Sequence, residues 1–196
     1  MSKLTYSILC EDKAHYLFIT KYLTLFSNKN KLKLTFKDDF YYRFKSANSK
    51  EVLKKYVNAS VIAFRDYNLD FLIIGIDYDD RNRNNFDKEI EHLYSKLYNQ
   101  FSHKSIIMFP VQAIEHWLLY IKYHQENPKS TKNISFEQIP RKEAKNKIYG
   151  INKYAPDVEY IIDSCMHNIY PDWLITRSKS FKKFQSDIID KLINQN

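Results

Sequence analysis

A chain of 196 residues is long enough to bury one continuous hydrophobic core without disulfides or a structural metal, so a single domain is expected. The chain has 31 lysines and arginines and 23 aspartates and glutamates, which gives a net charge of +8. This charge favours a polyanionic partner, although a soluble protein with a basic surface would have the same charge. Only two glycines occur, which excludes the glycine-rich phosphate loops of nucleotide-binding proteins. The two cysteines are far apart and suggest neither a disulfide framework nor a zinc module.

The first half of the chain alternates between patterns typical of strands and of helices. Strands are predicted at residues 4–10, 32–36, 71–76 and 105–109. The third of these is apolar throughout, as in a strand buried on both faces of a parallel sheet. Between them, helices are predicted at residues 13–26, 46–67 (in one piece or two) and 86–101, and an irregular connection at 38–42. This alternation indicates βαβ units and a mostly parallel α/β sheet of about four strands flanked by helices.

From residue 111 onward the pattern is almost wholly helical. Helices are predicted at residues 113–124, 140–149, 156–169 and 178–193, with a loop at 125–133. There is no sign of a second core or of a repeat. We therefore expect one domain over 1–196, with a sheet-containing core at 1–124 and a helical extension at 125–196.

Acidic residues follow two of the predicted strands. Asp77, Asp79 and Asp80 come directly after the third strand, and Glu11 follows the first. In open α/β sheets ligands bind outside the carboxyl ends of the strands, so Glu11 and Asp77 emerge together if both strands are central. Asp77 and Asp79, two residues apart in extended backbone, offer two oxygen ligands to one Mg²⁺. An aspartate-rich turn and a first-turn glutamate are the purely structural alternatives.

The order of these acids resembles that of the Toprim domains of topoisomerases, primases, small RNA-maturation nucleases and overcoming-lysogenization-defect (OLD) nucleases. Ile8-Leu9-Cys10-Glu11 and Ile74-Gly75-Ile76-Asp77-Tyr78-Asp79 match their glutamate and their Asp-x-Asp. Residues 110–119 and Ser178-Lys179-Ser180-Phe181 with Phe184 are similar to segments of small stand-alone Toprim-like proteins, often described as DUF4276-like. That group usually has Glu-Gly-x-Thr-Glu where this chain has Glu11-Asp12-Lys13-Ala14-His15.

The resemblance implies a Toprim-like fold and a metal-dependent nuclease that uses Mg²⁺ or Mn²⁺ to cleave nucleic-acid phosphodiesters. Glu115, one turn into the helix after the fourth strand, is expected to act as a further ligand or to orient a metal-bound water, unless it only caps that helix beside Trp117. The residues given a catalytic role are Glu11, Asp77, Asp79 and Glu115, and those given a metal-binding role are Glu11, Asp77, Asp79 and Asp80.

A site with several acids repels nucleic acid unless nearby cations compensate. Tyr78, between the two aspartates, is expected to contact a base or sugar, and His116 is expected on the surface or partly buried. Nucleic-acid contacts are predicted for Lys13, His15, Tyr78, Arg81, Arg83, Lys145, Lys147 and Lys179, with Lys142, Arg177, Lys182 and Lys183 as neighbours. For the lysines and arginines an ordinary solvated surface is the alternative.

The resemblance also implies a role as effector in anti-phage defence, working with an ABC/AAA-type ATPase encoded nearby. No stretch approaches the roughly 18 apolar residues that span a bilayer, so we expect a cytoplasmic protein without membrane contact. A homodimer is compatible with the sequence. Two other functions stay open. One is a non-catalytic adaptor that binds an ATPase or nucleic acid, and the other is hydrolysis or transfer of a small phosphorylated nucleotide in a closed pocket.

Overall fold

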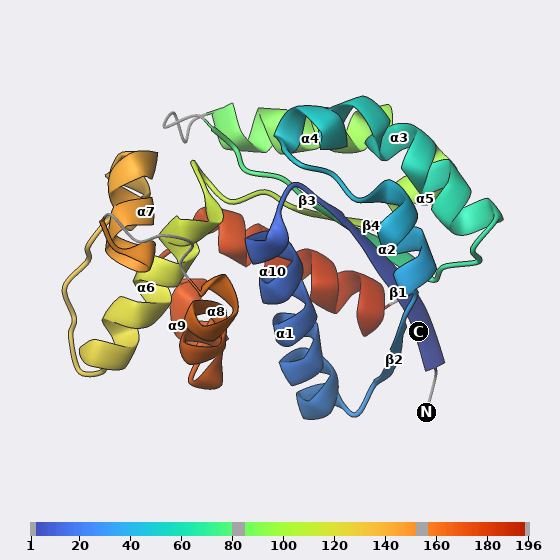
Figure 1. Ribbon diagram of the computed structural model, residues 1–196. Helices are drawn as coiled ribbons and strands as arrows, with labels where there is room; N and C mark the ends of the chain where they lie inside the picture. Colours follow the sequence, from blue (N-terminus) through green and yellow to red (C-terminus); the bar gives the residue numbers. More distant parts are fainter. Residues whose placement is uncertain (1–2, 80–84, 152–156, 195–196) are drawn as a thin grey trace.

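A four-stranded, all-parallel sheet forms the centre of the protein (Figure 1). The computed structural model describes residues 3–79, 85–151 and 157–194. The strands are β1 (Lys3–Cys10), β2 (Lys33–Phe36), β3 (Phe71–Gly75) and β4 (Ser105–Met108), in the spatial order β2-β1-β3-β4. The predicted α/β architecture with about four parallel strands is confirmed, and the fold is Rossmann-like.

Helices cover both faces of the sheet because the strand side chains alternate in direction. On one face, Ile8 and Ile73 share a core with α1 (Lys13–Asn30). On the other, Leu9 and Ile74 pack with α2 (Asp38–Phe44), α3 (Ser49–Arg65) and α4 (Phe86–Lys96), after which comes the short α5 (Asn99–Ser102). The chain therefore runs from β1 to β2 on one side of β1 and returns across to β3 on its other side. The carboxyl ends of β1 and β3 form the switch point at which such sheets bind ligands.

The C-terminal half is helical, as predicted. It contains α6 (Ile114–Glu126), the 3-10 turn η2 (Phe136–Gln138), α7 (Arg141–Tyr149), α8 (Val158–His167), α9 (Pro171–Leu174) and α10 (Lys179–Leu192). These helices extend the α1 face of the sheet, where Trp117 of α6 lies edge-on to Phe181 of α10 with 5.1 Å between ring centroids. Among the described helices none is long and apolar enough to cross a membrane.

Three local predictions were wrong. The expected irregular connection at 38–42 is the helix α2, which is stabilised by the stacking of Phe40 on Phe44 one turn later, with ring centroids 4.6 Å apart. The single helix expected at 86–101 is two helices, because the backbone becomes extended at Leu97. His116 is fully buried rather than at the surface, and its two ring nitrogens lie 3.0 Å from the carbonyl oxygens of Ala113 and Ile139.

Gly75 allows β1, β3 and the start of α1 to approach one another closely. A Cβ at this position would lie 3.1 Å from Cys10 Cβ, 3.2 Å from Ile19 Cδ1 and 3.3 Å from His15 Cδ2. These separations are tighter than ordinary van der Waals contacts. The absence of a side chain at the end of β3 thus lets His15 reach the edge of the sheet.

Candidate functional site

The structure brings Glu11 and Asp77 together at the carboxyl ends of β1 and β3. Glu11 N donates a hydrogen bond to Gly75 O over 3.2 Å, and Asp77 N donates to Glu11 Oε2 over 3.4 Å. Both residues are buried, with exposed fractions of 3% and 6%. Because the two strands are neighbours in a parallel sheet, the acids that follow them meet at one edge.

Glu11 divides its two carboxylate oxygens between the scaffold and the cleft. Its Oε2 accepts hydrogen bonds from Asp77 N and from the hydroxyl of Ser49, the first residue of α3. Its Oε1 faces Arg141, whose Nη2 lies 3.8 Å away. The bonds to Oε2 fix the orientation of the carboxylate and leave Oε1 between Arg141, which lines the cleft, and the buried His15, whose Nδ1 lies 3.9 Å away.

Asp77 also uses one carboxylate oxygen to bind the backbone and the other to bind Arg141. Its Oδ1 accepts a 2.9 Å hydrogen bond from Ile114 N and lies 3.1 Å from His15 Nε2, while its Oδ2 accepts a 2.8 Å bond from Arg141 Nη2. Ala113, the N-cap of α6, has no side-chain cap of its own, so Asp77 supplies it from a different part of the chain. The turn into α6 contains Gln112 at a φ of 64°, a backbone conformation that costs energy in a residue other than glycine.

Arg141 joins three carboxylates. Besides Glu11 and Asp77, its guanidinium donates through Nη1 to Oδ1 of Asp79, whose side chain is 58% exposed. Burial lowers the pKa of Arg141, but the charges of Asp77 and Asp79 outweigh it and raise that pKa above its ordinary value. Nothing in the sequence singled out Arg141, because it lies 64 residues from Asp77 and only the fold brings the two together.

His15 is a buried bridge between two acids. Its Nδ1 lies 2.9 Å from Oδ1 of Asp12, the N-cap of α1, and its Nε2 faces Asp77. Burial lowers the pKa of His15, but the charges of Asp77 and Asp12 raise it well above its ordinary value. For Asp77 the balance is the opposite: the charge of His15 lowers its pKa, but burial outweighs this and raises the pKa to about 7. Since His15 is fully buried, it is not placed for the phosphate contact predicted from the sequence.

Glu115 lies at the margin of the same site. It is buried in the first turn of α6, 3.9 Å from Lys145 Nζ through its Oε1. Its Oε2 has no hydrogen-bond partner among the described residues. Burial and then the charge of Glu115 raise the pKa of Tyr149, and its charge also acts on Arg141. The residue is therefore both a first-turn acid beside Trp117 and a contributor to the negative charge of the site.

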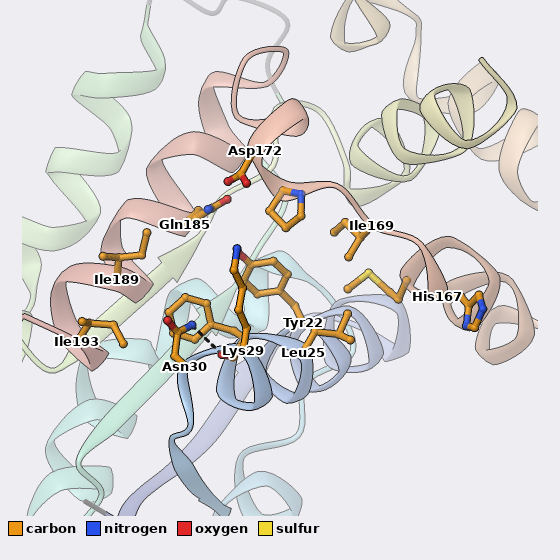
Figure 2. Close-up of a pocket in the computed structure, with 13 residues that line it drawn as sticks. Tyr22, Leu25, Lys29, Asn30, His167, Ile169, Asp172, Gln185, Ile189 and Ile193 are labelled. Atoms are coloured by element: carbon orange, nitrogen blue, oxygen red, sulfur yellow. Dashed lines mark hydrogen bonds between the residues drawn. The ribbon is translucent and has the colours of Figure 1, made fainter. Parts of the chain in front are cut away.

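A partly open cleft of about 530 Å³ is lined by three of these acids, Glu11, Asp12 and Asp79, while Asp77 and Glu115 lie buried beside it. One wall is the start of α3, with Asn48, Ser49 and Lys50, and the other is α7, with Arg141 and Lys145. A second hollow, of about 460 Å³, lies between the C-terminal half of α1 and α8, α9 and α10 (Figure 2). That hollow is mainly apolar and includes Leu25, Ile169 and Ile189, with Lys29 and Asp172 as charged members. The carboxylates make the cleft the better candidate for chemistry.

Other predicted contact residues lie in several surroundings. Tyr78 is buried against Phe86 and Phe109, so the base contact predicted for it does not fit its position. Lys145 lines the cleft, whereas Lys13, Lys147 and Lys179 are exposed and paired with acids outside it. These pairs are Lys13 with Glu159, Lys147 with Glu143, and Lys179 with Asp87. Asp80, Arg81 and Arg83 lie outside the described residues.

The fold and the site define an α/β protein with a carboxylate cluster at the switch point of a parallel sheet. Comparisons of the chain with family models, with curated proteins and with solved structures found no match.

Proposed function

We propose that this protein is a divalent-cation-dependent phosphodiesterase that cleaves nucleic acid. The observation that carries the proposal is the convergence of three carboxylate oxygens, Glu11 Oε1, Asp77 Oδ2 and Asp79 Oδ1, on the guanidinium of Arg141, which lines the cleft. Each oxygen comes from a different acid, and the two buried acids are oriented by bonds to their other oxygen. Such preorganisation is what a cation site requires.

The chemistry of the donor set fits Mg²⁺ or Mn²⁺, which prefer carboxylate oxygen ligands. Among the described residues, five carboxylates contact three basic groups, so negative charge is in excess. The acids are Glu11, Asp12, Asp77, Asp79 and Glu115, and the basic groups are His15, Arg141 and Lys145. Glu11, Asp12 and His15 also offer ligand atoms within 4.8 Å of one another. We favour the three oxygens that contact Arg141, because His15 and Asp12 already bind each other and Asp12 caps α1.

In a phosphodiesterase of this kind, a bound cation lowers the pKa of a water and offsets charge on the phosphate oxygens. Glu11 Oε1 faces the cleft, where a proton can be taken from or given to a reacting oxygen. Lys145 and Lys50, on opposite walls, supply positive charge for the flanking phosphates. The buried His15 lies 3.1 Å from Asp77 Oδ1 through its Nε2 and offsets part of the charge of that carboxylate.

The Toprim resemblance supports a narrower proposal, an effector nuclease of anti-phage defence that works with an ABC/AAA-type ATPase in the cytoplasm. This part of the proposal depends on the short sequence segments alone. A second candidate function, a non-catalytic adaptor for such an ATPase or for nucleic acid, is favoured by one observation. Arg141 already neutralises part of the acidic cluster, as expected of a site that has lost its cation. The open cleft gives less support to a closed pocket for a small nucleotide.

Cleavage assays separate these functions. We would incubate the purified protein with plasmid, single-stranded DNA and RNA in Mg²⁺, Mn²⁺ or EDTA, beside Glu11→Gln and the control Glu143→Gln, an acid of α7 paired with Lys147. Cleavage that needs a cation, is lost in E11Q and persists in E143Q supports the phosphodiesterase. If no substrate is cut even with the neighbouring ATPase present, the adaptor function replaces it.

A further inference from the structure

Arg141 occupies the point on which one oxygen each of Glu11, Asp77 and Asp79 converges. Its Nη2 lies 2.8 Å from Asp77 Oδ2 and 3.8 Å from Glu11 Oε1, and its Nη1 contacts Asp79 Oδ1. A divalent cation held by the same oxygens would lie against the guanidinium, and two positive charges at that separation repel each other strongly in a partly buried site. Arg141 and the cation therefore compete for the same three acids.

Arg141 has a second place available to it. It is the first residue of α7, its side chain is 36% exposed, and it lines the open cleft. Across the cleft, the wall at the start of the 17-residue helix α3 carries the basic Lys50, with Glu51 next to it in the first turn. The planar fork of a guanidinium pairs with a phosphate as well as with a carboxylate. An arginine leaving the acids thus remains within the cleft that a nucleic-acid strand would enter.

We propose that Arg141 is an internal counter-ion that a divalent cation displaces from Glu11, Asp77 and Asp79, and that it then binds a phosphate of the nucleic-acid strand in the cleft. The proposal rests on the function proposed above and adds an order of events to it. Cation binding releases the arginine, and the released arginine increases affinity for the strand. By thermodynamic linkage the strand then increases affinity for the cation by the same factor.

The first half of the proposal is tested by cation affinity, which needs no turnover. Mn²⁺ binding would be measured by calorimetry for the wild type, Arg141→Gln, Arg141→Lys and Lys147→Gln. Lys147 is the matched control, because it is a cation of the same helix that pairs with Glu143 and does not line the cleft. We expect the Mn²⁺ affinity of R141Q to rise by about tenfold, that of K147Q to change by less than about threefold, and that of R141K to stay between them. An R141Q affinity equal to or below that of the wild type would overturn the proposal.

The second half is tested by strand binding in Ca²⁺ and in EDTA, with fluorescent single-stranded DNA and RNA. We expect Ca²⁺ to tighten wild-type binding and R141Q to lose most of that gain, while circular dichroism confirms that the variant is folded. The same Ca²⁺ gain in R141Q and wild type would refute the phosphate contact. If both binding results hold but the wild type cuts nothing in Mg²⁺ or Mn²⁺, the phosphodiesterase fails while the role of Arg141 stands.

Discussion

The carboxyl edge of the sheet and the outer side of β4 both bury charged groups, but they balance them differently. Beside β4, the Tyr94 hydroxyl donates to Asp187 Oδ2 over 2.8 Å and accepts from Ile107 N over 2.9 Å. Lys191 Nζ donates to the carbonyl oxygens of Ser102 and Ser105. At the carboxyl edge, by contrast, carboxylates outnumber basic groups, and Glu11, Asp77 and Asp79 each turn one oxygen toward Arg141, which lines an open cleft.

The difference separates stability from function. Tyr94 satisfies a backbone N–H of β4, an edge strand of the sheet, so it blocks further strand pairing and attaches α4 to α10. Like charges gathered at the carboxyl edge repel one another and add little to stability, but they prepare a site for a cation. Substitutions at the two regions should therefore affect different measurements.

The largest effect is expected at the carboxyl edge, for Asp79→Asn. Its side chain is more than half exposed and contacts Arg141, so the free energy of unfolding should change by less than about 0.5 kcal/mol. Cation-dependent cleavage should fall by at least about 100-fold, since a direct ligand is lost. Initial rates and urea unfolding check both parts, with the exposed Asp163→Asn of α8 as control. Undiminished cleavage by D79N would remove Asp79 from the site.

Gly75→Ala should affect both stability and the site. The added Cβ meets Cys10 and His15 at 3.1 and 3.3 Å, so β1 and the start of α1 must shift, at a cost of about 1–3 kcal/mol. The affinity for Mn²⁺ should fall as well, because Glu11 and His15 move together with β1 and the start of α1. Gly150→Ala is the control: its φ of 83° makes it destabilising too, but Gly150 does not line the cleft. Equal Mn²⁺ affinities for G75A and the wild type would contradict this role of Gly75.

Tyr94→Phe should affect stability alone. The change leaves Ile107 N and Asp187 without this partner and should lower the free energy of unfolding by about 1–3 kcal/mol. Cleavage and Mn²⁺ affinity should stay at the wild-type level. Tyr98→Phe, an exposed tyrosine, should be close to neutral in the same urea titrations. A loss of cleavage in Y94F beyond that explained by unfolding would contradict the separation of the two regions.

The smallest effect is a pH dependence from Lys191, whose pKa burial lowers from 10.5 to about 8. Below pH 8 the lysine is protonated in both the folded and the unfolded protein. Between about pH 8 and 10.5 the unfolded protein holds more protons, so stability rises with pH relative to Lys191→Met. Over this pH range the free energy of unfolding should rise by on the order of 1 kcal/mol, once screening of the charge by solvent is allowed for. Parallel stability profiles for the two proteins over this range would show that Lys191 does not titrate as expected.

Much of the fold and part of the site could be predicted from the sequence. The apolar run of β3 indicated a central parallel strand, and acids after two such strands had to emerge at the same edge. The helix α2 and the break at Leu97 were missed, because short aromatic segments have no clear periodicity. The metal, the nucleic acid, the ATPase partner and the Toprim relationship stay predictions.

The sequence by itself determined the four strands, most of the helices and the edge on which Glu11 and Asp77 lie, because side-chain periodicity is a property of neighbouring residues. Only the tertiary structure decided that Arg141, Ser49 and Ile114 contact those acids and that Tyr78 is buried. The physical reason is that these contacts depend on how α3, α6 and α7 pack around the sheet. That packing is set by shape and charge between segments far apart in the chain, which no local pattern encodes.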